Sequence, residues 1–215
     1  GACGCDPDTG DGAGILFQIP HAFFHRTCES NGVSLPGPGK YAIGMVFLPR
    51  ESEQQLWCQG VIEKTIQDEG QVCLGWRDVP VDFTQAGEVA SQVAPLIRQF
   101  FVSCGPATDT QDRFERKLYV IRKVIENVVD AGLGQEDRDV FYISSLSSKT
   151  VVYKGLLRAN QLDSFYRDLS DDSITSALAL VHSRYSTNTL GSWRLAHPYR
   201  TLCHNGEINT IRGDQ

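Results

Sequence analysis

Short apolar runs alternate along the chain with longer segments in which apolar residues recur every three or four positions. Short runs rich in β-branched and aromatic residues predict β-strands. These runs are Ile15–Ile19, Tyr41–Leu48, Val72–Trp76, Leu96–Val102, Val140–Leu146, Thr150–Tyr153 and Ala177–Tyr185. We interpret Leu96–Val102 as a strand, with a helix as the alternative, and Val140–Leu146 with Thr150–Tyr153 as a hairpin. Ala177–Tyr185 is expected to be a buried strand.

Two longer segments, Ser52–Glu69 and Asp112–Ala131, have the periodicity of amphipathic helices, and each ends before a glycine, Gly70 or Gly132. Asp112 can cap the second helix. The expected core-facing positions are Leu56, Val61, Ile62 and Ile66 in the first helix and Leu118, Ile121, Ile125 and Val128 in the second. Shorter helices are predicted at His21–Asn31 and Asn160–Arg167.

Strands and helices are interspersed, and turn-rich segments separate them. Residues 1–14 are rich in glycine and aspartate and predict a loop, residues 34–40 a turn, and residues 78–87 an irregular segment. This order favours an α+β fold with antiparallel sheet over a Rossmann βαβ array. Because no linker divides the chain, we expect one domain over residues 1–215.

Composition narrows the function classes. The 215 residues are 41% hydrophobic and 21% charged, and no apolar run is long enough to span a membrane. A net charge of −6 without a basic stripe argues against nucleic acid and against a polybasic membrane contact. The seven scattered cysteines do not resemble a disulfide scaffold, so we expect a reducing compartment.

Two N-terminal motifs have alternative interpretations. Gly10 to Gly14 could suggest a dinucleotide loop, but the segment lacks G-x-G-x-x-G spacing and precedes a strand, so we favour a tight loop. Cys3 and Cys5 could suggest a zinc site, but no second ligand pair has suitable spacing, since Cys203 and His204 are adjacent. The other cysteines are expected to be small buried hydrophobes: Cys28, Cys58, Cys73 and Cys104.

The C-terminal segment carries the strongest candidate chemistry. Arg184 leaves an apolar run into Ser, Thr and Asn residues, a setting suited to holding a carboxylate by a bidentate fork. Asn205 and Gly206 usually indicate only a hairpin turn, which the residues by themselves favour. The Asn amide and the Gly backbone N–H could also converge on one oxygen as an oxyanion hole.

Several motifs together resemble the class II glutamine amidotransferase domain of the glutamate synthases. They are the opening C-G-C-D-P-D-T-G-D-G-A-G-I, the internal G-W-R-D-V-P and F-E-R-K-L-Y, and the pair H-S-R-Y-S-T-N-T and H-N-G-E-I-N. The resemblance covers essentially the whole chain in order. It implies an Ntn-hydrolase-type αββα sandwich of four layers with antiparallel sheets, α+β in class and incomplete at both ends. The implied activity is hydrolysis of L-glutamine to glutamate and ammonia.

The resemblance also implies the roles of individual residues. Arg184 matches the arginine that grips the glutamine α-carboxylate, Thr187 and Asn188 lie in the matching polar pocket, and Asn205 with Gly206 matches the oxyanion hole. The family nucleophile is an N-terminal cysteine that forms a thioester with the substrate.

Neither Cys3 nor Cys5 matches the position of that nucleophile. The chain is therefore expected to be a partial amidotransferase domain, inactive alone, with the nucleophile strand upstream and the remainder downstream. The alternative is a non-catalytic binding module that lost its nucleophile.

The family implies partners beyond this chain. Ammonia would pass to a synthase domain of the same full-length chain, which carries FMN and an iron–sulfur cluster and aminates 2-oxoglutarate. Electrons would come from a small subunit or from ferredoxin. No cofactor is expected within these 215 residues. The expected location is cytoplasmic, or the plastid in a photosynthetic eukaryote.

Overall fold

The computed structural model describes residues 6, 8–183 and 192–202. The chain folds into two compact units. The first contains Gly1–Phe17, Pro80–Ala94 and Val152–Gln215, and the second contains Gln18–Val79 and Pro95–Val151. Each unit is built around a sheet of its own.

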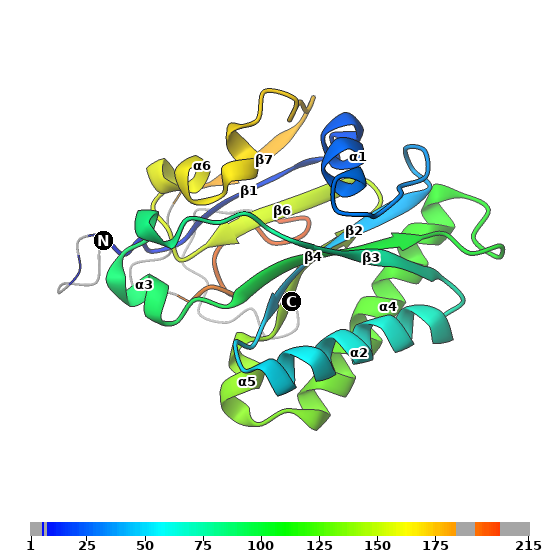
Figure 1. Ribbon diagram of the computed structural model, residues 1–215, viewed down its shortest axis with the longest axis horizontal. Coiled ribbons are helices and arrows are strands. Elements are labelled where there is room, and N and C mark those ends of the chain that lie inside the picture. Colours follow the sequence, from blue (N-terminus) through cyan, green and yellow to red (C-terminus); the bar gives the residue numbers. More distant parts are fainter. Residues whose placement is uncertain (1–5, 7, 184–191, 203–215) are drawn as a thin grey trace. The chain divides into compact units, whose positions relative to one another are not determined.

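The second unit is built on a four-stranded antiparallel sheet (Figure 1). Its order is β3 (Val72–Asp78), β4 (Leu96–Ser103), β2 (Tyr41–Leu48) and β5 (Tyr142–Ser147). Every residue of β2 is buried, which explains its unbroken apolar run. The strand interpretation of Leu96–Val102 is confirmed.

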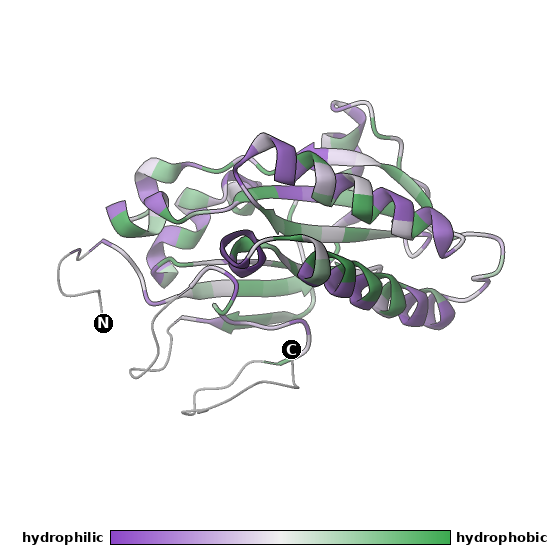
Figure 2. Cartoon of the chain, turned by 90° about the horizontal axis from the view of Figure 1, so that it is seen from below, coloured by the Kyte–Doolittle hydropathy of each residue, from purple (hydrophilic) through white to green (hydrophobic). Residues whose placement is uncertain are grey.

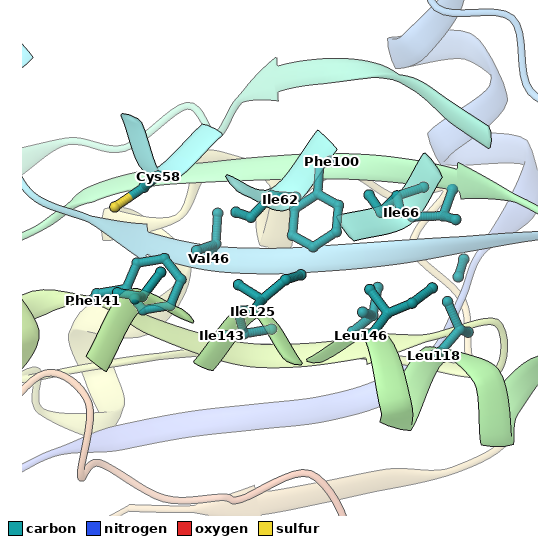
Figure 3. Close-up of a cluster of buried hydrophobic side chains, with 14 of the residues drawn as sticks. Val46, Cys58, Ile62, Ile66, Phe100, Leu118, Ile125, Phe141, Ile143 and Leu146 are labelled. Atoms are coloured by element: carbon teal, nitrogen blue, oxygen red, sulfur yellow. The ribbon is translucent and has the colours of Figure 1, made fainter. Parts of the chain in front are cut away.

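Helices α2 (Ser52–Asp68) and α4 (Gln111–Gly132) pack against one face of this sheet (Figure 1). Figure 3 shows side chains of both helices meeting strand residues such as Val46, Phe100 and Ile143. In Figure 2 the long helices carry both hydrophilic and hydrophobic residues, as amphipathic helices do. The fully buried helix residues of this cluster are Cys58, Ile62, Ile66, Leu118, Ile121 and Ile125. Burying each large aliphatic side chain contributes about 1.5–3 kcal/mol.

The other face of the same sheet carries buried polar groups beside apolar ones. Arg77 and Gln99 stand opposite each other on β3 and β4, and Arg77 Nη1 donates to Gln99 Oε1 over 2.8 Å. Helix α1 (His21–Glu29) lies against this face, where Phe24 makes an edge contact with Phe101. This hydrogen bond gives each of the two buried polar side chains a partner inside the protein.

The first unit contains a three-stranded sheet in the order β6 (Thr150–Gly155), β1 (Ala13–Gln18) and β7 (Ala179–His182). Strand β1 runs antiparallel to β7. The unit also contains η1 (Phe83–Gln85), α3 (Glu88–Gln92), η2 (Ala159–Gln161), α6 (Leu162–Phe165) and η3 (Arg167–Ser170).

Several local predictions were wrong. The N-cap of α4 is Thr110, whose hydroxyl accepts from Arg113 N, and not Asp112. Leu56 of α2 is 66% exposed, because that helix buries Cys58, Ile62 and Ile66 instead. Val128 of α4 is 41% exposed, because the core-facing stripe of α4 includes Val129 in its place.

Other errors concern weak or broken elements. The expected helix at Asn160–Arg167 is divided among η2, α6 and η3, and strand β7 is shorter than predicted and not buried. Strand β1 begins at Ala13, inside the expected loop. The short helices α3 and α5 (Gln135–Val140) were missed because they are too short for a periodic signal.

Across the described ranges, no helix combines the length and the apolar character needed to cross a membrane.

Gly44 is predicted to tolerate no side chain. A Cβ on Gly44 would lie 2.2 Å from ring carbons of Phe100 on the facing strand. We expect Gly44→Ala to lower the free energy of unfolding by about 1–3 kcal/mol through overpacking. A Cβ atom added to Gly60 in α2 would meet no heavy atom within 4 Å. Gly60→Ala should therefore raise the free energy of unfolding by about 0.5–1 kcal/mol. Denaturant unfolding followed by tryptophan fluorescence measures both, and equal effects of the two substitutions would contradict the packing argument.

Candidate functional site

The glycine-rich segment at the start of the chain is fixed by a carboxylate. Asp6 accepts hydrogen bonds from the backbone N–H groups of Asp8 (3.0 Å) and Val89 (3.1 Å) and from the Thr9 hydroxyl. Thr9 Oγ1 in turn accepts from Ala90 N over 3.2 Å. Asp6 and Thr9 thereby satisfy free N–H groups in the first turn of α3, which lies more than 75 residues away in sequence. These hydrogen bonds, that from the Thr9 hydroxyl first, lower the pKa of Asp6 to about 2.

The glycines of this segment permit close backbone packing. A Cβ on Gly10 would lie 2.0 Å from the carbonyl carbon of Leu157, and Gly12, with φ +126°, donates its N–H to Leu157 O over 3.2 Å. Arg158 pairs with Asp8 at 3.0 Å on the same side. Protein backbone therefore occupies the space beside these glycines, as the tight-loop interpretation predicts.

Lys154, Gly14 and His182 form a row across the three strands of the first unit's sheet. Gly14 and His182 are direct partners in the β1–β7 register, so they share a face. A Cβ on Gly14 would lie 2.5 Å from Lys154 Cβ, which places Lys154 beside it. The same atom would lie 2.6 Å from His197 O. A second segment therefore crosses the sheet directly over Gly14.

That crossing segment, residues 192–202, is called the strap. Trp193 anchors its start, because the indole N–H donates to Ala90 O over 3.0 Å and the ring packs over Gly155, where a Cβ would lie 2.4 Å from it. Lys154 Nζ donates to Arg194 O over 2.8 Å. The strap is thus tied both to α3 and to β6.

Aromatic rings continue from Lys154 toward β7. Lys154 Nζ lies 4.9 Å from the centroid of the Tyr199 ring. The Tyr199 ring lies 4.3 Å from that of His197, and the His197 ring lies 4.7 Å from that of His182. These four side chains are called the column.

Lys154 is fully buried, at 0% exposed. Burial disfavours the ammonium form, and the positive charges of Arg200 and Arg194 act in the same direction, so the pKa of Lys154 lies well below its ordinary value. The Lys154 backbone carbonyl accepts from the hydroxyl of Tyr166 over 2.7 Å. A lysine held in this way donates hydrogen bonds at fixed positions in a dry environment.

A pocket of about 550 Å³ lies on the other face of the sheet. Its lining includes Ile15 and Phe17 of β1, Leu162 and Asp163 of α6, and Ala179 of β7. Side chains alternate between faces along a strand, so Ile15 and Phe17 point away from the face that carries Gly14. The pocket is mostly apolar and is separate from the strap.

Comparisons with known proteins decide the family. The profile of the class II glutamine amidotransferases matches residues 1–215. The chain belongs to the class II glutamine amidotransferases. The α+β Ntn-hydrolase-type class expected from the sequence is confirmed, and each unit contributes an antiparallel strand pairing.

Relatives of this amidotransferase chain carry the glutamate synthase name, so the resemblance noted from the sequence is confirmed. The chain is 51% identical to the glutamate synthase [NADPH] large chain of Bacillus subtilis and 43% identical to that of Azospirillum brasilense. It is 41% identical to the chloroplastic ferredoxin-dependent glutamate synthase of Oryza sativa subsp. japonica. All of this chain is covered in each comparison, and it spans 13–14% of each relative's length.

The site residues predicted from the sequence lie outside the described residues of this amidotransferase chain. They are Arg184, Thr187, Asn188, Asn205 and Gly206. The described elements end close to them in sequence: β7 ends at His182, and the strap ends at residue 202. Their assigned roles stay predictions.

Sequence reasoning missed the strap contacts, including Lys154, Trp193, His197 and Tyr199. One signal was available, because Lys154 directly follows the predicted strand Thr150–Tyr153 and precedes the apolar residues Leu156 and Leu157. Charged residues are almost never fully buried without a partner, so a lysine there indicates a special role.

The described cysteines of this amidotransferase lie in or against the hydrophobic cores of the units. Cys28 and Cys58 are buried thiols outside any disulfide, and burial raises the pKa of Cys58 to about 12. Cys73 and Cys104 are partly buried and pack on the core of the second unit, and burial raises the pKa of Cys73. Small-hydrophobe roles are confirmed for Cys28 and Cys58. Cys3, Cys5 and Cys203 lie outside the described residues.

The depressed pKa of Asp6 predicts how the α3 contact responds to acid. The ordinary value is 3.8 and the folded value is about 2, so the Asp6 contribution to stability is fully present above 3.8 and is lost as the pH falls through 2. An NMR titration of the Asp6 carboxyl carbon should show a midpoint near 2. Thr9→Val removes the hydroxyl donor and should move that midpoint toward 3.8. An unchanged midpoint in the variant would remove Thr9 as the main cause.

Proposed function

We propose that this chain is the glutamine-hydrolysing part of a glutamate synthase. It would release ammonia from L-glutamine, and the ammonia would serve the reductive amination of 2-oxoglutarate to L-glutamate. The observation that carries the proposal is the family match over residues 1–215 together with relatives that bear the glutamate synthase name.

Arg184 is proposed to hold the glutamine α-carboxylate. A guanidinium presents a planar fork that matches two carboxylate oxygens. Thr187 and Asn188 would supply polar groups beside it. The proposal is supported by the matching motif H-S-R-Y-S-T-N-T, which begins at the last residue of β7.

Asn205 and Gly206 are proposed to form the oxyanion hole. The carbonyl oxygen of the glutamine amide gains negative charge as the nucleophile attacks, and an amide N–H with a backbone N–H stabilises that charge. The nucleophile would be a cysteine of the longer protein, because neither Cys3 nor Cys5 matches its sequence context. The expected inactivity of these 215 residues alone is part of this proposal.

The remaining partners are proposed for the longer protein. Its synthase domain would carry FMN and an iron–sulfur cluster and would receive the ammonia. The electron donor would be a small subunit or ferredoxin, since relatives of both the NADPH and the ferredoxin type match this chain. A cytoplasmic location is proposed for a bacterial protein and the plastid for a photosynthetic eukaryote, since the rice relative is named chloroplastic.

Asn205→Asp tests the oxyanion role. The substitution replaces a donor by an anion of nearly the same size, so kcat for glutamine hydrolysis by the full-length protein should fall by at least about 10²–10³-fold. The loss should fall on kcat more than on KM, because the interaction strengthens in the transition state. Ammonia-dependent glutamate synthesis should persist and serves as the internal control. Aspartate also suits a hairpin turn, so near-normal glutamine hydrolysis would make Asn205 an ordinary turn residue.

Arg184→Lys tests the carboxylate role. Lysine keeps the charge but loses the fork, which should weaken glutamine binding by about 1.5–3 kcal/mol, the worth of a charged hydrogen bond. Steady-state kinetics should show a raised KM for glutamine. An unchanged KM would remove Arg184 from this role. Absence of glutamine hydrolysis in the unaltered full-length protein would instead favour a non-catalytic binding module.

A further inference from the structure

The column and the strap connect two segments that lie next in sequence to the proposed site residues. His182 lies two residues before Arg184, and Tyr199 lies six residues before Asn205. Lys154 binds the strap at Arg194 O, and the rings of Tyr199, His197 and His182 continue to β7. One continuous set of contacts therefore links the end of β7 to the strap.

We propose that Lys154 is a positioning residue for glutamine hydrolysis, which fixes the strap over Gly14 and through it the chain that leads to Asn205. The inference rests on the proposed function. Lys154 does not touch substrate in this proposal; it acts through Arg194 O and the Tyr199 ring.

Energetics favour a positional role for Lys154 over a simple stabilising one. Removing an amino group from water is costly, and an unbranched apolar side chain could occupy the same place without that cost. The depressed pKa agrees with this desolvation. What an apolar side chain cannot do is donate a hydrogen bond to one particular carbonyl, Arg194 O, at 2.8 Å. The lysine therefore selects one placement of the strap.

The packing around Lys154 restricts the strap to one position over the sheet. The strap backbone packs closely against Gly14, since a Cβ atom on Gly14 would lie only 2.6 Å from His197 O. Trp193 holds the start of the strap by donating its indole N–H to Ala90 O. A displacement of about 1 Å in a catalytic group lowers rates by about 10²-fold, so a small release of the strap would be visible in kcat.

The first experiment compares Lys154→Met with Tyr166→Phe in the full-length protein. Lys154→Met keeps an unbranched chain and removes the donor to Arg194 O. Tyr166→Phe removes the hydroxyl that donates to Lys154 O but leaves the strap contacts in place. We expect kcat for glutamine hydrolysis to fall by about 10–10²-fold in Lys154→Met, with a change of less than about threefold in KM. Tyr166→Phe should lower the midpoint of thermal unfolding without changing kcat.

A second pair keeps the test decisive if Lys154→Met does not fold. Tyr199→Phe retains the ring beside Lys154 and loses only the hydroxyl that donates to Leu195 O, whereas Tyr199→Leu removes the ring. We expect Tyr199→Phe to retain kcat and Tyr199→Leu to lower it by about tenfold. Ammonia-dependent glutamate synthesis should persist in every variant and reports an intact synthase domain.

Hydrogen exchange of the backbone amides of residues 192–202 separates failure of this inference from failure of the proposed function. Exchange should become faster in Lys154→Met, while peptides from β2 should be unchanged. Faster exchange with unchanged kcat would overturn the positioning role and leave Lys154 purely structural. Unchanged exchange would overturn the anchoring of the strap. No glutamine hydrolysis by the unaltered protein, with faster exchange in Lys154→Met, would overturn the proposed function and with it the positioning role.

Discussion

The arrangement of the first unit depends on the close crossing of the strap over Gly14. Gly14 has no side chain, so the carbonyl oxygen of His197 can pack closely against it. A Cβ atom at this position would lie only 2.6 Å from that oxygen, which is too close. With the strap this close to the sheet, Lys154 Nζ can donate to Arg194 O. The Trp193 indole N–H can likewise donate to Ala90 O. Ala90 belongs to α3, whose first turn is held by Asp6 and Thr9. The absence of a side chain at Gly14 in β1 thus permits a set of hydrogen bonds that links β6, the strap, α3 and the segment of Asp6 and Thr9.

Aromatic packing offsets the cost of burying polar groups in this unit. The Phe165 ring packs against the rings of Tyr166 and Trp193 at centroid distances of 4.8 and 5.5 Å. Tyr153 stands edge-on to Tyr166 at 5.1 Å. Tyr153 donates its hydroxyl to Asp168 over 2.8 Å. Each ring combines a large apolar area with, in the Tyr and Trp residues, a polar atom that finds a partner. Apolar burial and directed hydrogen bonds therefore come from the same side chains.

The sequence predicted elements where one local signal was sufficient, and failed where distant contacts decide. Strand β2 was predicted residue for residue, because an unbroken apolar run ends before Pro49. Helix α3 has five residues and is capped by Asp6 and Thr9 from far along the chain, which no local pattern reveals. The residues around Arg184 already suggested a carboxylate site, whereas the oxyanion role of Asn205 came from the resemblance, since the residues alone favoured an ordinary Asn-Gly turn. Lys154 was missed because its partner, Arg194 O, is 40 residues away.

The two units use burial differently, and the difference bears on function. In the second unit α2 and α4 cover one sheet face with interchangeable aliphatic side chains, and such cores tolerate repacking when volume is kept. In the first unit buried Lys154, Trp193 and Tyr166 each donate to one particular backbone carbonyl. Such contacts add little net stability, since each replaces a hydrogen bond to water, but they are lost when the carbonyl moves away. A chain segment held in this way has one favoured position, and the strap, held by Lys154 and Trp193, immediately precedes in sequence the stretch that carries Asn205 and Gly206.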